Sequence, residues 1–336
     1  MSLQYFTEKV TKGKDLSRVE MNNAATHIFD QTASADEIKE FLLALHQKGE
    51  VVDEIVGLVD VVMEHKIPFQ AVSANYFDNC GTGGDKLNTF NISTTTAFVL
   101  AGCGVPIAKH GNRKISSQSG SSDVLEALGI DIVQTPAQIA EQLSTLQIAF
   151  LHAPNFHPKL GSLREIRSEI PHATIFNLIG PLCNPAPLHS QIVGINRADL
   201  LETYAEALQL LGRKRAIVLS GADGLDEASL HGATKYATVL NGEIKLQTIS
   251  PEQLGFERIS LNDIKGGTAQ QNADILVDIL NNKQSAYFDT VLLNAAFGLL
   301  AYGVTSNFEK ALQLARNSIS TGKAIAKLRS LQQFHM

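Results

Sequence analysis

The sequence predicts an α/β protein in which a small all-helical domain joins a large α/β domain with a mainly parallel central sheet. Three observations predict it. Residues 1 to about 66 carry only helical patterns, and from about residue 75 short apolar runs alternate with helical stretches. The stretch 272–332 is helical again. Strands that alternate with helices are typical of parallel sheets, because a parallel connection needs a crossover.

The chain is long enough for two ordinary domains, with 336 residues, 44% of them apolar and 18% charged. Its net charge of −6 argues against a nucleic-acid partner. The most apolar late window, 293–304, is too short to span a bilayer, so we expect no membrane partner. Three cysteines without metal-ligand spacing indicate reduced thiols, and we expect a cytoplasmic protein.

The N-terminal helices are predicted from their caps. Segments 17–20 and 34–37 each place a glutamate three residues after a serine, which is the capping-box pattern. The second box precedes an apolar stripe at helical spacing, and Gly49 follows the stripe where a helix would end. A further helix is expected to end before Pro68.

Strands of the large domain are predicted from apolar runs separated by helical patterns such as 198–212. The runs are FVLAGCGV followed by PIAK, IAFLHA, QIVGI and AIVLSG, at 98–109, 148–153, 191–195 and 216–221. Asn241-Gly242 stands between two alternating segments and predicts a β-hairpin, an antiparallel piece of the sheet. The C-terminal helical region is punctuated by Gly298, Gly303 and Gly322.

The first segment that carries chemistry is 78–94. Gly81, Gly83 and Gly84 allow backbone N–H groups to approach a phosphate closely. Residues 91–94 then look like the start of a helix, whose positive end also favours anions. Taken alone, this pattern fits a plain tight turn followed by a helix cap about as well as a phosphate site.

Two further segments add cations and acids. Segment 109–120 follows a predicted strand and mixes three cations with hydroxyl, amide and glycine residues, which suits a highly charged anion. Segment 224–227, Gly-Leu-Asp-Glu, follows another strand, and its two carboxylates suit Mg²⁺ shared with substrate phosphates. The competing interpretations are a solvated basic turn and a solvated acidic turn.

These segments and one more occur in the order found in anthranilate phosphoribosyltransferases, and this sequence resembles that family over nearly its whole length. The motifs are GTGGD (81–85), NTFNIST (88–94), KHGNR (109–113), IFNLIGPLCNPA (175–186) and GLDE (224–227). The resemblance implies transfer of the phosphoribosyl group of phosphoribosyl pyrophosphate (PRPP) to the amino group of anthranilate, in tryptophan biosynthesis. Pyrophosphate is released, and Mg²⁺ is required.

The resemblance also implies an architecture, shared with pyrimidine nucleoside phosphorylases. The helical domain would comprise 1–70 together with about 160–184, and the α/β domain 71–159 and 185–336. A homodimer joined through the helical domains is implied as well.

Site residues are implied position by position. PRPP contacts fall on Gly81, Gly84, Asp85, Thr89, Asn91, Ile92, Ser93, Thr94, Lys109, His110, Gly111, Asn112, Arg113, Lys114, Ile115, Ser116, Ser117 and Ser121. Anthranilate contacts fall on Gly81, Asn112 and Arg167. Two Mg²⁺ ions per subunit fall on Ser93, Asp226 and Glu227, with Glu227 shared. No covalent nucleophile is expected, and Cys80 is interpreted as a structural thiol.

Three questions stay open at this point. Asp85 follows the glycines of an anion site, and we hypothesise that its carboxylate faces metal-bound water or a ribose hydroxyl. Arg167 would bind the carboxylate of anthranilate, or it would pair with Glu165 or Glu169 along its own helix. His152 stands where the family more often has Phe, and it would pack or line the anthranilate channel.

Two other functions compete with the transferase. One is a pyrimidine nucleoside phosphorylase-like enzyme of the same fold, and the other a non-catalytic relative that binds nucleic acid.

Overall fold

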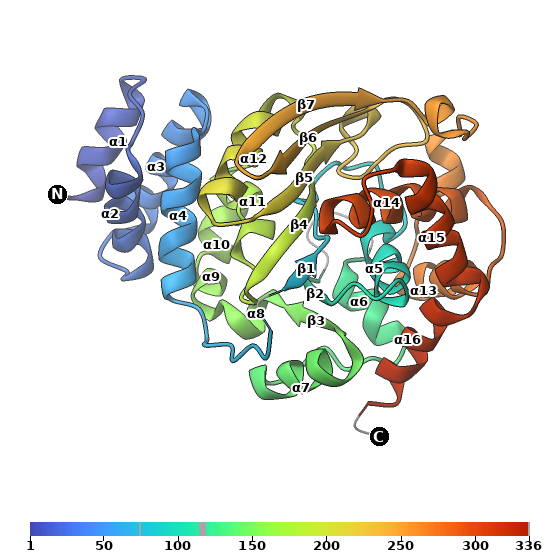
Figure 1. The fold of residues 1–336 in the computed structure, drawn as a ribbon. Coiled ribbons are helices and arrows are strands. Elements are labelled where there is room, and N and C mark those ends of the chain that lie inside the picture. The colour runs from blue at the N-terminus through green and yellow to red at the C-terminus, as the bar shows by residue number, and fades with distance from the viewer. Residues whose placement is uncertain (74, 114–118, 335–336) are drawn as a thin grey trace.

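The computed structural model describes residues 1–73, 75–113 and 119–334. Four helices form a unit at the N-terminal end, at the left of Figure 1. They are α1 (Leu3–Thr11), α2 (Arg18–Phe29), α3 (Ala35–Lys48) and α4 (Val52–Glu64). Both predicted capping boxes are confirmed, since the Ser17 and Ser34 side chains accept from the backbone N–H groups of Glu20 and Glu37.

A seven-stranded sheet runs through the rest of the molecule, in the order β3-β2-β1-β4-β5-β6-β7. β1 to β5 are parallel, and β6 and β7 are antiparallel additions at one edge. The predicted fold class is therefore confirmed. The strands are β1 (Tyr76–Asp78), β2 (Ile107–Gly111), β3 (Ile148–His152), β4 (Leu188–Gly194), β5 (Arg215–Ser220), β6 (Thr234–Leu240) and β7 (Glu243–Ile249).

Helices cover both faces of this sheet. α12 (Leu201–Leu210) shares a hydrophobic cluster with α4 on one face. On the other face α5 (Ile92–Gly102) and α14 (Ala286–Tyr302) pack together within the main core. The remaining helices are α6 (Ser121–Ala127), α7 (Pro136–Leu146), α8 (Ala153–Phe156), α9 (Pro158–Ser162), α10 (Arg164–Ser168), α11 (Ile175–Leu178), α13 (Ala269–Leu280), α15 (Phe308–Ser320) and α16 (Lys323–Gln332).

Short 3₁₀ helices complete the connections. They are η1 (Pro181–Cys183), η2 (Ala198–Leu200), η3 (Ala222–Gly224), η4 (Pro251–Leu254) and η5 (Leu261–Ile264). None of the helices in the described ranges is long and apolar enough to cross a bilayer.

The interpretation of FVLAGCGV, 98–105, as a strand is wrong. Residues 98–102 belong to α5, and only the following segment, 107–111, is a strand. Phe98, Val99 and Leu100 are fully buried, because α5 lies inside the core. A helix that is apolar on every face has no amphipathic period, so a short apolar run does not separate it from a buried strand.

Glycines in the second half have different roles. Asn241 and Gly242 both have positive φ, 51° and 86°, and they join β6 to β7 as the predicted hairpin. Gly303 ends α14 with a φ of 93°. Gly298, predicted to interrupt the helical region, instead lies inside α14, where an added Cβ would stand 2.8 Å from Leu100 Cδ1.

Segment 163–183 packs with the N-terminal helices. Leu163, Ile175 and Phe176 are buried in the same hydrophobic cluster as α1 to α4. Lys39 of α3 forms a salt bridge with Glu169, 2.5 Å from Nζ to Oε2. These contacts support the proposal that the chain returns to the helical domain near 160–184, whose limits stay a prediction.

Candidate active site

The predicted PRPP and metal segments follow the carboxyl ends of neighbouring strands. The chain runs outward from β1 to β3 and then returns to place β4 on the other side of β1. Such a reversal creates a crevice beyond the strand ends, where open α/β sheets bind ligands. The glycine loop follows β1, Asn112 and Arg113 follow β2, and the acidic segment follows β5. The sheet therefore gathers these segments along the side where the carboxyl ends of its parallel strands lie.

The glycine loop lies directly against the acidic segment. The backbone N–H of Gly83 donates to Asp226 Oδ2 at 2.6 Å. At Gly81 there is no room for a side chain, since an added Cβ would stand 2.7 Å from Asp226 Oδ2. Gly83 and Gly84 have positive φ, 69° and 81°, a conformation that glycine adopts at little cost. Close approach to Asp226 thus explains Gly81, and positive φ explains Gly83 and Gly84.

The acids at this edge are crowded and partly buried. Burial raises the pKa of Asp226 to about 7, and the neighbouring Asp85 carboxylate acts in the same direction. Burial and the Asp226 charge hold the pKa of Glu227 well above its usual range, although Lys109 and a hydrogen bond with Ser93 oppose this. Like charges held together without a cation favour protonation. A bound cation would favour the ionised forms of Asp226 and Glu227.

These residues fit Mg²⁺ better than a transition metal. The predicted donors are all oxygen atoms, from the carboxylates of Asp226 and Glu227 and the hydroxyl of Ser93. In the described part of the chain, no three His, Cys, Asp or Glu side chains are arranged to hold a metal ion. Mg²⁺ binds through one or two carboxylates, substrate phosphates and water, so an incomplete protein cage is expected.

Asp85 sits on the acidic side of the loop. Its Oδ1 accepts from the backbone N–H of Leu87 at 3.1 Å, which fixes the turn after the glycines. Its carboxyl group lies within hydrogen-bonding reach of Asp226. This position is compatible with the hypothesis that Asp85 faces metal-bound water.

Lys109 and His110 belong to β2 itself rather than to the loop after it, and both are buried. Burial lowers the pKa of His110 to about 3, so the ring is neutral. Lys109 was predicted as one of three cations in the loop segment 109–120, but it lies inside the sheet. Its positive charge opposes the effect of burial on the pKa values of Asp78 and Glu227.

Asp78, at the end of β1, was not among the predicted site residues. It is fully buried and accepts from the side chains of Asn184 and Gln191 and the backbone N–H groups of Cys80 and His110. Through these bonds it ties the start of the glycine loop to β2 and β4. The sequence signal was an acid directly after the apolar pair Tyr76-Phe77, which is unusual inside a strand.

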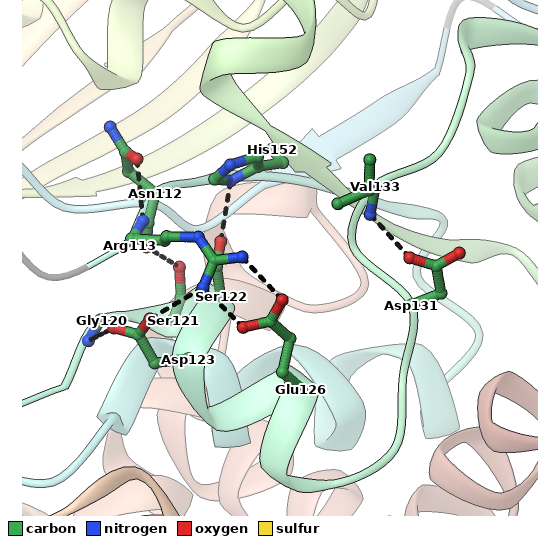
Figure 2. A network of polar contacts seen from close by, with 10 residues as sticks. All are labelled: Asn112, Arg113, Gly120, Ser121, Ser122, Asp123, Glu126, Asp131, Val133 and His152. Carbon is green, nitrogen blue, oxygen red and sulfur yellow. Dashed lines mark hydrogen bonds and ion pairs between the residues drawn. The ribbon is translucent and has the colours of Figure 1, made fainter.

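Figure 2 shows the segment after β2 together with α6. The Arg113 guanidinium is engaged by Glu126, and its backbone N–H donates to Asn112 Oδ1 at 2.8 Å. Ser121 Oγ donates to the Asn112 carbonyl at 3.1 Å, so these two predicted contacts are brought together. Lys114, Ile115, Ser116 and Ser117 lie outside the described residues.

His152, at the end of β3, packs rather than standing free. Its Nδ1 lies 3.0 Å from Ser122 Oγ of α6, and its side chain is buried. This contact supports the packing interpretation.

The start of α5 differs from expectation in one detail. Asn91 precedes the helix, but its side chain does not cap it. Instead Asn91 Oδ1 accepts from Asn272 Nδ2 of α13 at 2.7 Å, and Asn91 Nδ2 donates to the Ser119 carbonyl. The Ile92 N–H, the first of α5, donates instead to the Phe90 carbonyl at 2.8 Å. Thr89 lies next to this start and pairs with Lys265 as an isolated bridge.

Arg167 lies on α10, an element that carries none of the other predicted site residues. Its guanidinium stands 5.3 Å from the centre of the Phe176 ring, and burial lowers its pKa. Within the described ranges it forms no salt bridge, and Glu169 instead pairs with Lys39. The intrahelical pair is therefore not formed. No hydrogen bond joins Arg167 to another predicted site residue in these ranges.

Cys80 adjoins the glycine loop. Burial raises the pKa of its thiol to about 12, and Sγ donates to the Gly81 carbonyl. A thiol this weakly acidic stays protonated near neutral pH, which agrees with a structural role.

Comparisons with known proteins agree with this arrangement. The model of the glycosyl transferase family, a/b domain, matches residues 73–325, and that of the family's helical bundle domain matches residues 4–66. A curated anthranilate phosphoribosyltransferase from Listeria innocua is 47% identical, over 98% of this chain and 97% of its own length. The chain belongs to the anthranilate phosphoribosyltransferase family. A member from Bacillus cereus is also 47% identical, over 97% of this chain and 96% of its own.

Solved structures of anthranilate phosphoribosyltransferases share the fold. One from Thermus thermophilus superposes with a TM-score of 0.92 at 33% identity, covering 98% of both chains. One from Saccharomyces cerevisiae, in complex with PRPP and Mg, has a TM-score of 0.91 at 27% identity, covering 98% of this chain and 96% of its own. Another yeast structure of the family contains 4-fluoroanthranilate.

Proposed function

We propose that this chain transfers the phosphoribosyl group of PRPP to the amino group of anthranilate, giving N-(5-phosphoribosyl)anthranilate and pyrophosphate, in tryptophan biosynthesis. The observation that carries the proposal is the meeting of the glycine loop with Asp226 at the sheet edge, where Lys109 and Glu227 also lie. A pyrophosphate ester with bound metal needs this combination of backbone donors, a cation and oxygen ligands.

The pyrophosphate side of the site is assigned to the glycine loop and the start of α5. Backbone N–H groups in glycine turns and at helix starts are donors that suit the oxygen atoms of an anion. Ser93, Asp226 and Glu227 would hold two Mg²⁺ ions per subunit, with Glu227 shared. Bound Mg²⁺ supplies positive charge that stabilises the leaving pyrophosphate. The protein residues hold the departing group in one orientation, so little reorganisation is needed during the reaction.

The acceptor is assigned to the other side of the crevice. Arg167 has no acidic partner in the described ranges, so its fork is available for a carboxylate such as that of anthranilate. Gly81 and Asn112 would contact the same molecule. The aromatic amine is a weak nucleophile, so the rate enhancement comes from holding the amine in line with the ribose. No side chain acts as a covalent nucleophile.

The proposal also includes the oligomeric state and the cellular location. We infer a homodimer through the helical domains, supported by exposed apolar side chains on α1, α2 and α3: Tyr5, Val19 and Leu43. Light scattering should give twice the chain mass, and the mass of one chain would refute the dimer.

We also infer action in the cytoplasm, which agrees with three cysteines that form no disulfide. Secretion into an oxidising compartment, found by cell fractionation, would refute it.

The test is the loss of anthranilate fluorescence on mixing the purified protein with PRPP and Mg²⁺. We expect a fall that requires all three components. No fall would overturn the proposal, and phosphorolysis of thymidine or uridine in the same preparation would then identify a nucleoside phosphorylase. A DNA shift at physiological salt would identify a nucleic-acid-binding relative.

A further inference from the structure

A cavity of about 430 Å³ lies at the junction between α4 and the sheet. Its walls come from the last turns of α4, the segment just after α4, η1 and the residues that precede β4 and β5. The cavity is therefore near the starting ends of β4 and β5, whereas the candidate active site lies beyond their carboxyl ends. We call it the junction cavity, and its lining includes Val59, Met63, Lys66, Phe69, Leu182 and Arg213.

Two cations line this cavity without an acidic partner. Lys66 forms no hydrogen bond or salt bridge through its side chain within the described ranges, and burial lowers its pKa. Arg213 likewise forms no salt bridge there, and burial lowers its pKa to about 10. Burying positive charge without an opposite charge is costly. An anion placed between the two would offset that cost.

Arg213 is held in place by neutral partners. Its Nε donates to Gln191 Oε1 at 3.0 Å, and its Nη1 donates to the Leu211 carbonyl at 3.3 Å. Gln191 is in turn fixed by donating to the Pro181 carbonyl at 2.7 Å. Asp78, the acid whose charge acts on Arg213, is already occupied by four hydrogen-bond donors. A guanidinium fixed in this way loses little conformational entropy on binding a ligand.

Apart from Asn184, which already donates to Asp78 and to the Ala108 carbonyl, the other lining residues are apolar. Val59 and Met63 come from α4, Phe69 from the following segment and Leu182 from η1. A cavity of this size falls within the range of small-molecule sites, which combine apolar walls with a few placed polar groups. Inorganic phosphate would satisfy the cations and leave these walls exposed to water.

We propose that the junction cavity binds a small organic carboxylate with an apolar body. The carboxylate lies between Arg213 and Lys66, and the body packs against Val59, Met63 and Leu182. The site is separate from the one assigned to anthranilate, and the proposal does not depend on the reaction proposed above.

The test uses 4-fluorobenzoate as the probe and follows its fluorine resonance on titration with the intact protein. The titrations are made in the Arg167→Ala chain, because the proposed acceptor site also takes an aromatic carboxylate. We expect saturable binding that weakens about tenfold in Arg213→Gln and in Lys66→Met, as for the loss of a charged hydrogen bond. Uncharged 4-fluorobenzamide should also bind about tenfold more weakly.

Lys214→Met is the matched control, because Lys214 is exposed and adjoins Arg213 but does not line the cavity. It should leave the affinity for 4-fluorobenzoate unchanged. Equal affinity in Arg213→Gln, Lys66→Met and the control would overturn the proposal, as would equal binding of the amide. If Arg213→Gln fails to fold, Lys66→Met decides alone. An error in assigning Arg167 to the acceptor site would be seen in a different measurement, as an unchanged anthranilate KM in Arg167→Ala.

Discussion

The Arg113 guanidinium forms a bidentate ion pair with the Glu126 carboxylate, with Nη1–Oε2 and Nη2–Oε1 distances of 2.6 and 2.7 Å. Figure 2 shows the pair beside α6, with Asp123 next to it. Arg113 is one of the residues proposed to bind PRPP. Its fork cannot serve a phosphate and Glu126 at the same time in this geometry, so binding of PRPP through Arg113 would require the pair to break.

Replacing Glu126 with Gln should therefore lower the KM for PRPP. The paired side chains are 47% and 40% exposed, and such pairs contribute about 0.2–1 kcal/mol. We expect a decrease of about 1.5- to 5-fold, with the KM for anthranilate unchanged, measured by steady-state kinetics. Glu202→Gln, an exposed glutamate on α12, is the control. A higher KM for PRPP would show that Glu126 aids binding.

The acidic segment should make activity depend on Mg²⁺. EDTA is expected to abolish turnover, and added Mg²⁺ to restore it, because Asp226, Glu227 and Ser93 supply oxygen ligands for a hard cation. Glu227→Gln should reduce kcat more than Asp226→Asn, since Glu227 is assigned to both ions. Turnover assays across a Mg²⁺ titration measure both effects. Full activity in metal-free buffer would contradict the assignment.

Asp78 should make stability depend on pH. Burial raises its pKa from 3.8 to about 6, so between these values the folded protein holds a proton that the unfolded chain releases. The contribution of Asp78 to the free energy of unfolding is greatest below about pH 4. It falls by roughly 3 kcal/mol as the pH rises to about 6. Urea unfolding at several pH values should show the fall in the wild type.

Asp78→Asn should remove that fall. Its amide would also face the donors of Asn184 and Gln191, so we expect a loss of about 1–3 kcal/mol at pH 7. Asp274→Asn, at an exposed position of α13, should keep the wild-type profile. Identical pH profiles for Asp78→Asn and the wild type would rule out this role.

Arg167→Ala should raise the KM for anthranilate by about tenfold or more, as expected for the loss of a charged contact of about 1.5–3 kcal/mol. The KM for PRPP should change far less, because the phosphate segments lie on other elements. Arg164→Ala, an exposed arginine of the same short helix, is the control. Equal damage to both KM values in Arg167→Ala, or none, would count against the placement.

Local signals in the sequence predicted much of the fold. The capping boxes at Ser17 and Ser34 and the Asn241-Gly242 hairpin were predictable because their bonds join residues close in sequence. β1 has only three residues and was missed, since so short a run has no detectable period. The motifs predicted which segments carry chemistry, and those residue assignments stay predictions.

Partners distant in sequence were not predictable. Nothing near Asp78 indicates Asn184 or Gln191, and nothing near Arg113 indicates Glu126 as its partner, since both arrangements depend on how strands and helices come together. The same holds for Lys39, which takes Glu169 and leaves Arg167 unpaired in the described ranges.

The residue after the acidic segment is fixed by a helix near the end of the chain. Asn294 of α14 accepts from the Ala228 N–H at 2.8 Å and donates to the Ala228 carbonyl at 3.0 Å. During synthesis, the glycine loop and β5 therefore leave the ribosome well before the helix that fixes Ala228. A chain cut after residue 285 should contain the glycine loop and the acidic segment 224–227, but it should lack the helix that fixes the acidic segment in place. The order of the acidic segment is thus acquired late in translation, only after α14 has been made.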